Sequence, residues 1–227
     1  QLLANSKLNN TCKILVPQAL ISTYQIAANW SDHASQFEPI ENYVITRSNG
    51  QVTVTPQREI SLYHYAVDNI SDYQTITTLP QANIEELTNI VVSADASQAF
   101  HGCRKLTTLS GVETTWRTSN VTSMYLMFYQ SGLTDVDFSN WDTSNVTNMS
   151  GMFQESKIPN EAFANFNTSS LTDMSSMFNY WEGGDILDLS HFDMSKVVHA
   201  GTVFRRCAAK RIIFPSDLTS STSPFIR

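Results

Sequence analysis

The feature that most constrains this chain is a 13-residue string that recurs every 25 or 26 residues in its C-terminal half. The copies begin at Trp116, Trp141, Phe166 and Phe192, and an incomplete copy covers residues 99–109. A unit this short cannot bury its own apolar side chains, whereas stacked neighbours bury them against one another. The repeat therefore predicts stacked coils in this half.

Each copy carries two apolar patterns. Residues ahead of the aromatic, such as Val136 and Phe138, alternate with polar residues, which predicts a short strand with one buried face. After the aromatic, Val146, Met149 and Met152 are spaced by three, which predicts one face of a helical segment. The period lies within the range of leucine-rich repeats. We therefore expect an α/β (α+β) fold: a short leucine-rich-repeat-like solenoid with a small N-terminal α+β module.

Equivalent residues of neighbouring coils should form ladders. We expect the phenylalanines that end each copy, Phe153 among them, to stack in the core. The serines at equivalent positions should each contribute one hydroxyl that satisfies the same backbone group; they are Ser119, Ser144, Ser169 and Ser195. Cys103 and Cys207 lie at equivalent positions in distant coils, so we expect both to be reduced and unpaired with each other.

The string Trp-Asp-Thr-Ser-Asn-Val-Thr-Asn-Met-Ser-Gly-Met-Phe at residues 141–153 closely resembles the repeat of the BspA-like leucine-rich-repeat surface proteins. The resemblance covers residues 97–215. The last copy departs from the pattern, with Val198 for threonine and Ala200 for methionine, as a capping coil does. The resemblance implies a bacterial cell-surface or secreted protein with a role in adhesion to host proteins or other cells.

The N-terminal half carries a second pattern. Residues 13–16 predict a strand, Pro17 suits the first turn of a following helix, and Trp30 ends that helix. This VP-x-x-L-x-x-x-Y-x-x-A-x-x-W element resembles one found in gut bacterial surface proteins and in virion proteins of the phages that infect such bacteria.

Alternating apolar residues on both sides of Asn49-Gly50 predict a β-hairpin over residues 43–55. Further strands are expected at residues 60–67 and 88–93. We therefore expect two domains, the α+β module at residues 1–95 and the solenoid of about four coils at residues 96–227.

Composition excludes several function classes. The net charge is −7, which argues against a nucleic-acid partner, since phosphate binding needs clustered Lys and Arg. The one basic cluster is interpreted as a solvated end of the fold; it comprises Arg205, Arg206, Lys210 and Arg211. No apolar run approaches the roughly 18 residues of a membrane span. Because the chain opens with Gln1, we expect a processed product or a piece of a longer protein.

The sequence contains no metal-binding, phosphate-binding or nucleophile motif, so we expect neither an enzyme nor a cofactor or metal. Two groups are candidates for partner binding. Asp135 and Asp137 form an Asp-x-Asp on an outer face, with Asp188 in a later coil; a solvated acidic surface is the alternative. Tyr180 and Trp181 lie beside two glycines, where an aromatic pair stacks on a sugar or anchors a protein; a packed loop insertion is the alternative.

These observations predict a non-catalytic extracellular protein that binds a host or cell-surface protein or glycan. The alternative is a structural virion protein of a bacteriophage, such as a fibre, decoration or tail component, whose partners are other virion proteins or the host surface. The sequence does not distinguish the two, and it predicts no oligomeric state.

Overall fold

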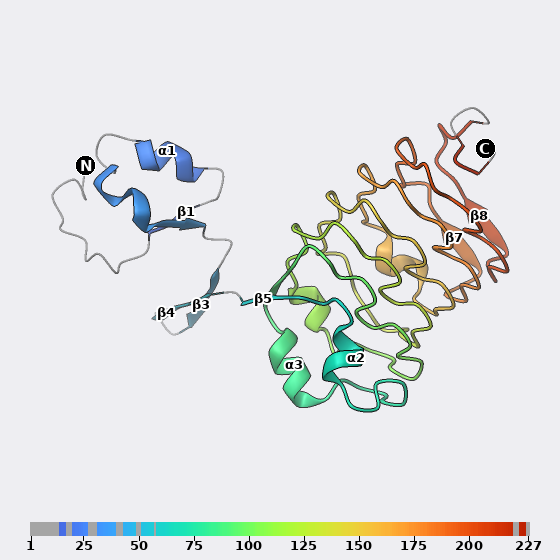
Figure 1. The fold of residues 1–227 in the computed structure, drawn as a ribbon, viewed down its shortest axis with the longest axis horizontal. Helices are drawn as coiled ribbons and strands as arrows, with labels where there is room; N and C mark the ends of the chain where they lie inside the picture. Colours follow the sequence, from blue (N-terminus) through green and yellow to red (C-terminus); the bar gives the residue numbers. More distant parts are fainter. Residues whose placement is uncertain are drawn as a thin grey trace. The chain divides into compact units, whose positions relative to one another are not determined.

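The computed structural model describes residues 14–16, 20–26, 31–39, 43–48, 51–56, 58–219 and 223–225 (Figure 1). The chain divides into two compact units, Gln1–Gln57 and Arg58–Arg227. The predicted domain boundary after residue 95 stays a prediction, while the second compact unit begins earlier, at Arg58.

The first unit contains a parallel pair of strands. β1 (Ile14–Val16) pairs with β2 (Phe37–Pro39), and α1 (Ile21–Ile26) and the 3-10 helix η2 (Ser31–Gln36) lie between them in the chain. A parallel pair needs such a crossover connection. The predicted strand and helix are thus present, and Pro17 and Trp30 of the VP…W element lie outside the described residues.

The predicted hairpin is confirmed. β3 (Tyr43–Ser48) and β4 (Gln51–Pro56) pair antiparallel, and Ser48 faces Gln51 at the end next to the turn. This register leaves two residues between the strands, as expected from the Asn-Gly pair, which itself lies outside the described residues.

The second unit begins with another parallel pair, β5 (Arg58–Ile60) and β6 (Ile90–Val92), with α2 (Tyr65–Asn69) and α3 (Gln81–Leu87) between them. The strand expected near residue 90 is therefore present. The strand expected over residues 60–67 is wrong beyond Ile60, because this stretch turns into α2. Tyr65 and Ala66 are both buried there, whereas successive residues of a strand would point to opposite faces.

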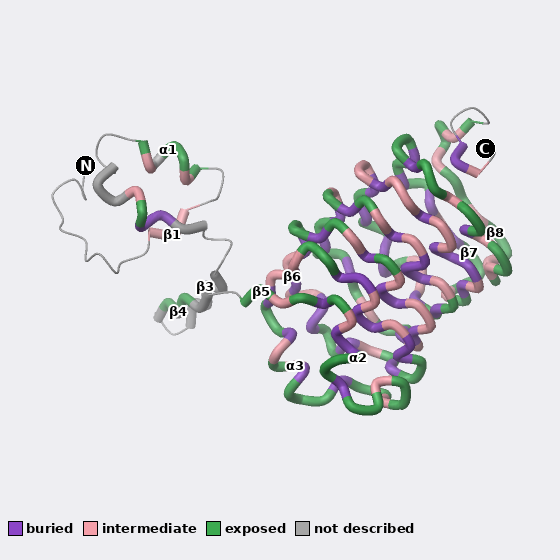
Figure 2. Tube along the Cα trace, viewed as in Figure 1, coloured by how far each residue is buried: buried purple, intermediate pink, exposed green. Residues whose placement is uncertain are grey.

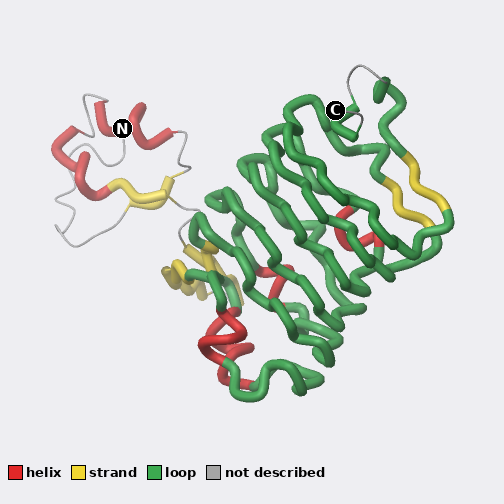
Figure 3. The backbone as a smooth tube through the Cα atoms, turned by 45° about the vertical axis from the view of Figure 1, so that its right-hand side comes forward, coloured by secondary structure: helices red, strands yellow, loops and turns green. Residues whose placement is uncertain are grey.

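Beyond β6 the expected fold class is wrong. The regular elements described there are the 3-10 helices η4 (Val112–Thr115) and η5 (Asn160–Phe163) and the parallel strands β7 (Ile186–Asp188) and β8 (Arg211–Ile213). Turns and isolated bridges make up the rest (Figure 3). The described residues after β6 form no leucine-rich-repeat solenoid with a strand and a helix in each coil. Over the described residues the protein is an α+β fold with short, separate two-stranded sheets and three α-helices.

The error has a physical cause in the residues around Gly151. The backbone N–H groups of Met149, Gly151 and Phe153 donate to carbonyls 24 residues further along the chain, at 2.8–3.1 Å. An α-helix would direct them to carbonyls four residues back. Gly151 and Glu155 have φ of 63° and 53°, so the chain turns repeatedly and buries Met149 and Met152 without a helix. Apolar spacing of three and four is thus compatible with such turns.

Aromatic rings fill the centre of the second unit. The stretches of chain that correspond to the repeat copies are here called segments, and Figure 2 shows buried residues along them. The rings of Phe128, Phe153 and Phe178 follow one another with centroids 6.2 and 5.8 Å apart, and Phe153 is fully buried. The predicted burial and stacking of Phe153 are therefore confirmed. Trp116 and Trp141 form a second stack at 5.7 Å.

Threonine hydroxyls, rather than the expected serines, join these segments. The Oγ1 atoms of three buried threonines donate to backbone carbonyls 24 or 25 residues further along, at 3.0–3.2 Å; the residues are Thr118, Thr143 and Thr168. The neighbouring serine instead completes a local turn, since the Ser144 N–H donates to Asp142 Oδ1 at 3.0 Å. The serine prediction is therefore wrong, although a hydroxyl in each segment does satisfy a backbone group.

Leu126 and Gly151 illustrate how closely neighbouring segments approach. Both residues are in the left-handed region, with φ of 52° and 63°. A Cβ atom placed on Gly151 would lie 2.4 Å from Cδ2 of Leu126. Glycine at 151 therefore makes room for the leucine side chain of the preceding segment.

Candidate functional site

The predicted acidic residues lie on the surface and are held by local turns. Asp135 and Asp137 are exposed, and Asp188 is half-buried. Oδ1 of Asp137 accepts from the Ser139 N–H at 2.8 Å, and Oδ1 of Asp188 accepts from the Ser190 N–H at 2.9 Å. The pKa of each of these two carboxyls is lowered by hydrogen bonds from the side chain and backbone of its serine. Both carboxyls therefore release their protons at a lower pH than an unperturbed aspartate does.

The three aspartates do not form a metal site. Within the described ranges, no group of three His, Cys, Asp or Glu side chains is placed to hold a metal ion. The carboxylates of Asp137 and Asp188 each accept a hydrogen bond from a backbone N–H of their own turn.

Near this surface lies a buried acid that the sequence did not single out. Glu113 is 2% exposed, and its Oε1 accepts from the Asp137 N–H at 3.2 Å. Its Oε2 is buried with no hydrogen-bond partner. Burial raises the pKa of Glu113, and the charges of Asp135 and Asp137 raise it further. No periodic pattern in the short sequence of η4 marks Glu113 as buried.

The predicted aromatic pair is divided between core and surface. Trp181 is fully buried, its Nε1 donates to the Ile158 carbonyl at 2.9 Å, and its ring meets the edge of Phe178. Trp181 is therefore a core residue in this conformation. Tyr180 is half-buried, its Oη accepts from Arg206 Nη1 at 2.9 Å, and the Arg206 guanidinium lies over its ring at 5.3 Å.

Tyr180 belongs to a line of surface side chains, all but the first at equivalent positions, here called the edge row: Arg104, Gln130, Glu155, Tyr180 and Arg206. Arg104 Nη2 donates to Gln130 Oε1 at 2.6 Å, and Gln130 Nε2 donates to Glu155 Oε2 at 2.7 Å. Gln130, Glu155, Tyr180 and Arg206 share left-handed backbone, with φ of 53–55°. Each of these four follows a repeat phenylalanine by two positions, a signal that the sequence offered and that our predictions missed.

Two aromatic side chains extend the edge row. The rings of His101 and Tyr129 stack with centroids 5.0 Å apart, and Tyr129 Oη donates to Glu155 Oε1 at 3.4 Å. Burial, followed by the Glu155 charge, raises the pKa of Tyr129, so this hydroxyl keeps its proton at neutral pH. The edge row thus offers aromatic faces, hydrogen-bond donors and acceptors side by side.

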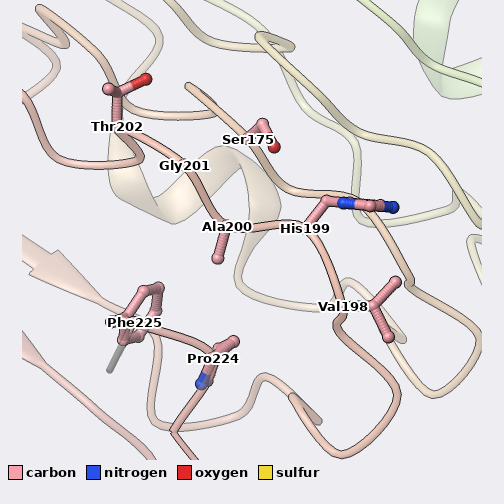
Figure 4. Close-up of a pocket in the computed structure, with 8 residues that line it drawn as sticks. All are labelled: Ser175, Val198, His199, Ala200, Gly201, Thr202, Pro224 and Phe225. Carbon is pink, nitrogen blue, oxygen red and sulfur yellow. The ribbon is translucent and has the colours of Figure 1, made fainter. Parts of the chain in front are cut away.

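A polar cavity of about 490 Å³ lies beside the last of these segments (Figure 4). Ser175, His199 and Thr202 line it, and Pro224 and Phe225 face them from the C-terminal tail.

Both cysteines in the described part of the chain are free thiols, as predicted for Cys103 and Cys207. Cys103 is fully buried, and burial raises its pKa to about 12. Cys12 lies outside the described residues. In the part of the chain that the structure describes, no helix combines the length and apolar character of a membrane span.

Comparison with known proteins places the chain in a family. The family described as "Mycoplasma protein of unknown function, DUF285" matches residues 94–214, more than half of the chain. The match is compatible with the resemblance to BspA-like surface proteins. Neither curated proteins nor solved structures gave a match. The chain belongs to the family of the Mycoplasma proteins of unknown function, DUF285.

Proposed function

We propose that the protein is a non-catalytic extracellular surface protein that recognises a protein or glycan on another cell through the edge row. Family membership supports the surface location, since it is compatible with a surface protein. No observation on the described residues favours the virion alternative over this one.

The observation that carries the proposal is the fixed alignment of the edge row. Hydrogen bonds hold Arg104, Gln130 and Glu155 together, and Arg206 holds Tyr180 by a hydrogen bond and a cation–π contact. Side chains that are ordered before binding lose less conformational entropy when a partner arrives. Tyrosine and arginine are also the residue types that contribute most often to binding energy at interfaces.

The chemistry of the remaining groups supports a non-catalytic role. The buried Cys103 has a raised pKa and is a poor nucleophile. Asp137 and Asp188 have lowered pKa values and are used in turns, whereas a general acid needs a raised pKa and access to a substrate.

A binding experiment on arrays tests the proposal. Purified protein is applied to a printed glycan array and to an array of extracellular matrix proteins, together with Tyr129→Ala and Tyr63→Ala variants. Tyr63 is a matched control, since it is exposed and stacks on His64 at 4.3 Å, as Tyr129 stacks on His101, but lies outside the edge row.

We expect Tyr129→Ala to weaken binding by at least about tenfold, as removal of an interface tyrosine commonly does. Tyr63→Ala should bind like the wild type. Equal binding by all three proteins, or an equal loss in both variants, would show that the edge row is not the binding surface.

A further inference from the structure

A second surface lies at the end of the segment that contains Thr202. In each earlier segment, alternate backbone N–H groups donate to carbonyls of the following segment. The last such set donates at 2.8–3.0 Å to residues 199–205, from Met174, Ser176, Phe178 and Tyr180. The equivalent donors one segment later have no acceptor among the described residues; they are Ala200, Thr202, Phe204 and Arg206. Four aligned amide groups are therefore left free along what we call the open edge, residues 199–206.

The opposite end of the same unit is closed. His64 directly precedes α2 and Ala66 lies within it. Their N–H groups donate to the carbonyls of Ser97 and Ala99, at 3.1 and 2.8 Å respectively. Free backbone donors are costly to bury but are ready to pair with an added extended chain. The open edge is thus distinct from the closed end in its hydrogen-bonding capacity.

Within its described residues, the C-terminal tail contacts the Phe204 ring of the open edge and accepts no hydrogen bond from the four amides. Phe225 meets the Phe204 ring at 5.3 Å and an angle of 60°, whereas the ring of Phe178 stacks on Phe204 at an angle of 5°. The polar cavity of about 490 Å³ separates the tail from the backbone of residues 199–202 (Figure 4). The position that a further stacked segment would take is therefore only partly filled.

The charge around the open edge is positive in a chain whose net charge is −7. Arg205, Arg206, Lys210 and Arg211 are all exposed, and Lys210 alone among them forms an ion pair in the described structure, with exposed Asp185 at 2.9 Å. Such a local excess of positive charge favours an acidic partner.

We propose that the open edge binds an extended acidic segment of a partner protein. The segment adds in the parallel direction, as the bridges between the preceding segments do, and its alternate carbonyls accept from the four free amides. Carboxylates on the bound segment face Arg205 and Arg206. The open edge and the edge row share Arg206, but each is tested by a variant outside the other surface, Arg205→Glu for the open edge and Tyr129→Ala for the edge row.

The probe is a fluorescein-labelled peptide that copies residues 172–180, with its last two residues replaced by glutamates. Its register places the four carbonyls opposite the free amides and the glutamates beside Arg205 and Arg206. Binding to the full chain is measured by fluorescence anisotropy at low salt. We expect Arg205→Glu to weaken binding about five- to tenfold, from the loss of an exposed ion pair and the repulsion that replaces it. Lys105→Glu, a charge reversal at another exposed residue, should leave binding unchanged.

Amide hydrogen exchange followed by NMR tests the geometry directly. The peptide should slow exchange at Ala200, Thr202, Phe204 and Arg206. Protection at other amides, equal weakening by both charge reversals, or equal binding of a peptide with glutamines in place of the glutamates would overturn the proposal. Concentration-dependent self-association that protects the same four amides without peptide would overturn it in favour of a second copy of the chain.

Discussion

The buried hydroxyl of Thr143 offers a sharp test of how neighbouring segments are held together. Its Oγ1 donates to the Asn167 carbonyl at 3.0 Å and accepts from the Asn167 N–H at 2.8 Å, and the residue is fully buried. Thr143→Val keeps the shape of the side chain and removes both hydrogen bonds. The Asn167 carbonyl then loses its hydrogen-bond donor, and the Asn167 N–H loses its acceptor.

The expected cost follows from these two bonds. Each intramolecular hydrogen bond contributes about 1 kcal/mol net, so the pair contributes about 2 kcal/mol to the free energy of unfolding. Asn167 itself is exposed, so water replaces part of the lost bonding. We therefore expect the free energy of unfolding to fall by about 1–3 kcal/mol. For a unit of this size, a loss of about 2 kcal/mol lowers the Tm by about 4–8 °C.

The assay is a urea titration followed by the fluorescence of the buried tryptophans. Thr147→Val is the matched control, because Oγ1 of Thr147 also donates to a carbonyl 25 residues away, that of Thr122 at 3.2 Å, but Thr147 is exposed. The control should change the stability by less than about 0.5 kcal/mol. Equal effects of the two substitutions would refute the argument that the buried hydroxyl, rather than threonine at these positions in general, joins the segments.

Two further predictions concern the core and the buried acid. Phe153→Ala should lower the free energy of unfolding by about 3–5 kcal/mol because it leaves a cavity among stacked rings, whereas Phe214→Ala, at a 36% exposed ring, should cost far less in the same titration. A small effect at Phe153 would mean that the rings do not form the core. The raised pKa of Glu113 means that the folded state binds a proton at this carboxyl more tightly than the unfolded state does. The protonated carboxyl therefore stabilises the fold fully below its ordinary pKa, and this contribution is lost as the pH rises through the folded-state pKa. Glu113→Gln should therefore be more stable than the wild type at neutral pH, and the difference should shrink in acid; stability curves of the two proteins that run parallel from acid to neutral pH would contradict this assignment.

The sequence predicted local structure where one interaction dominates. Asn49-Gly50 between alternating strands sufficed for the hairpin, because the turn residues and the apolar pattern agree. The helical segment predicted around Met149 failed because its backbone hydrogen bonds go to a segment 24 residues away. A pattern of buried positions reports which side chains are inside, and not which carbonyl each N–H contacts.

The candidate surface was predicted only in part. Tyr180 was found as half of an aromatic pair with Trp181, at a place where the other copies hold polar residues, but Gln130 and Glu155 at the equivalent positions resemble ordinary surface residues in sequence. Their alignment depends on the left-handed backbone at each position. A glycine in the sequence would have indicated that conformation, whereas a glutamine does not. Trp181 was singled out for the same reason as Tyr180, yet its ring fills the core.

The close approach of Leu126 and Gly151 limits how the sequence can drift. A side chain at 151 needs the space that Cδ2 of Leu126 occupies, so a substitution at 151 forces the leucine side chain to move as well as straining the backbone. Shortening residue 126 first opens that space, and the strain of a left-handed non-glycine residue, which Ser176 already tolerates at the next equivalent position, is then the main remaining cost. A substitution at 151 therefore costs less once residue 126 has been shortened, and among relatives the two residues should vary together.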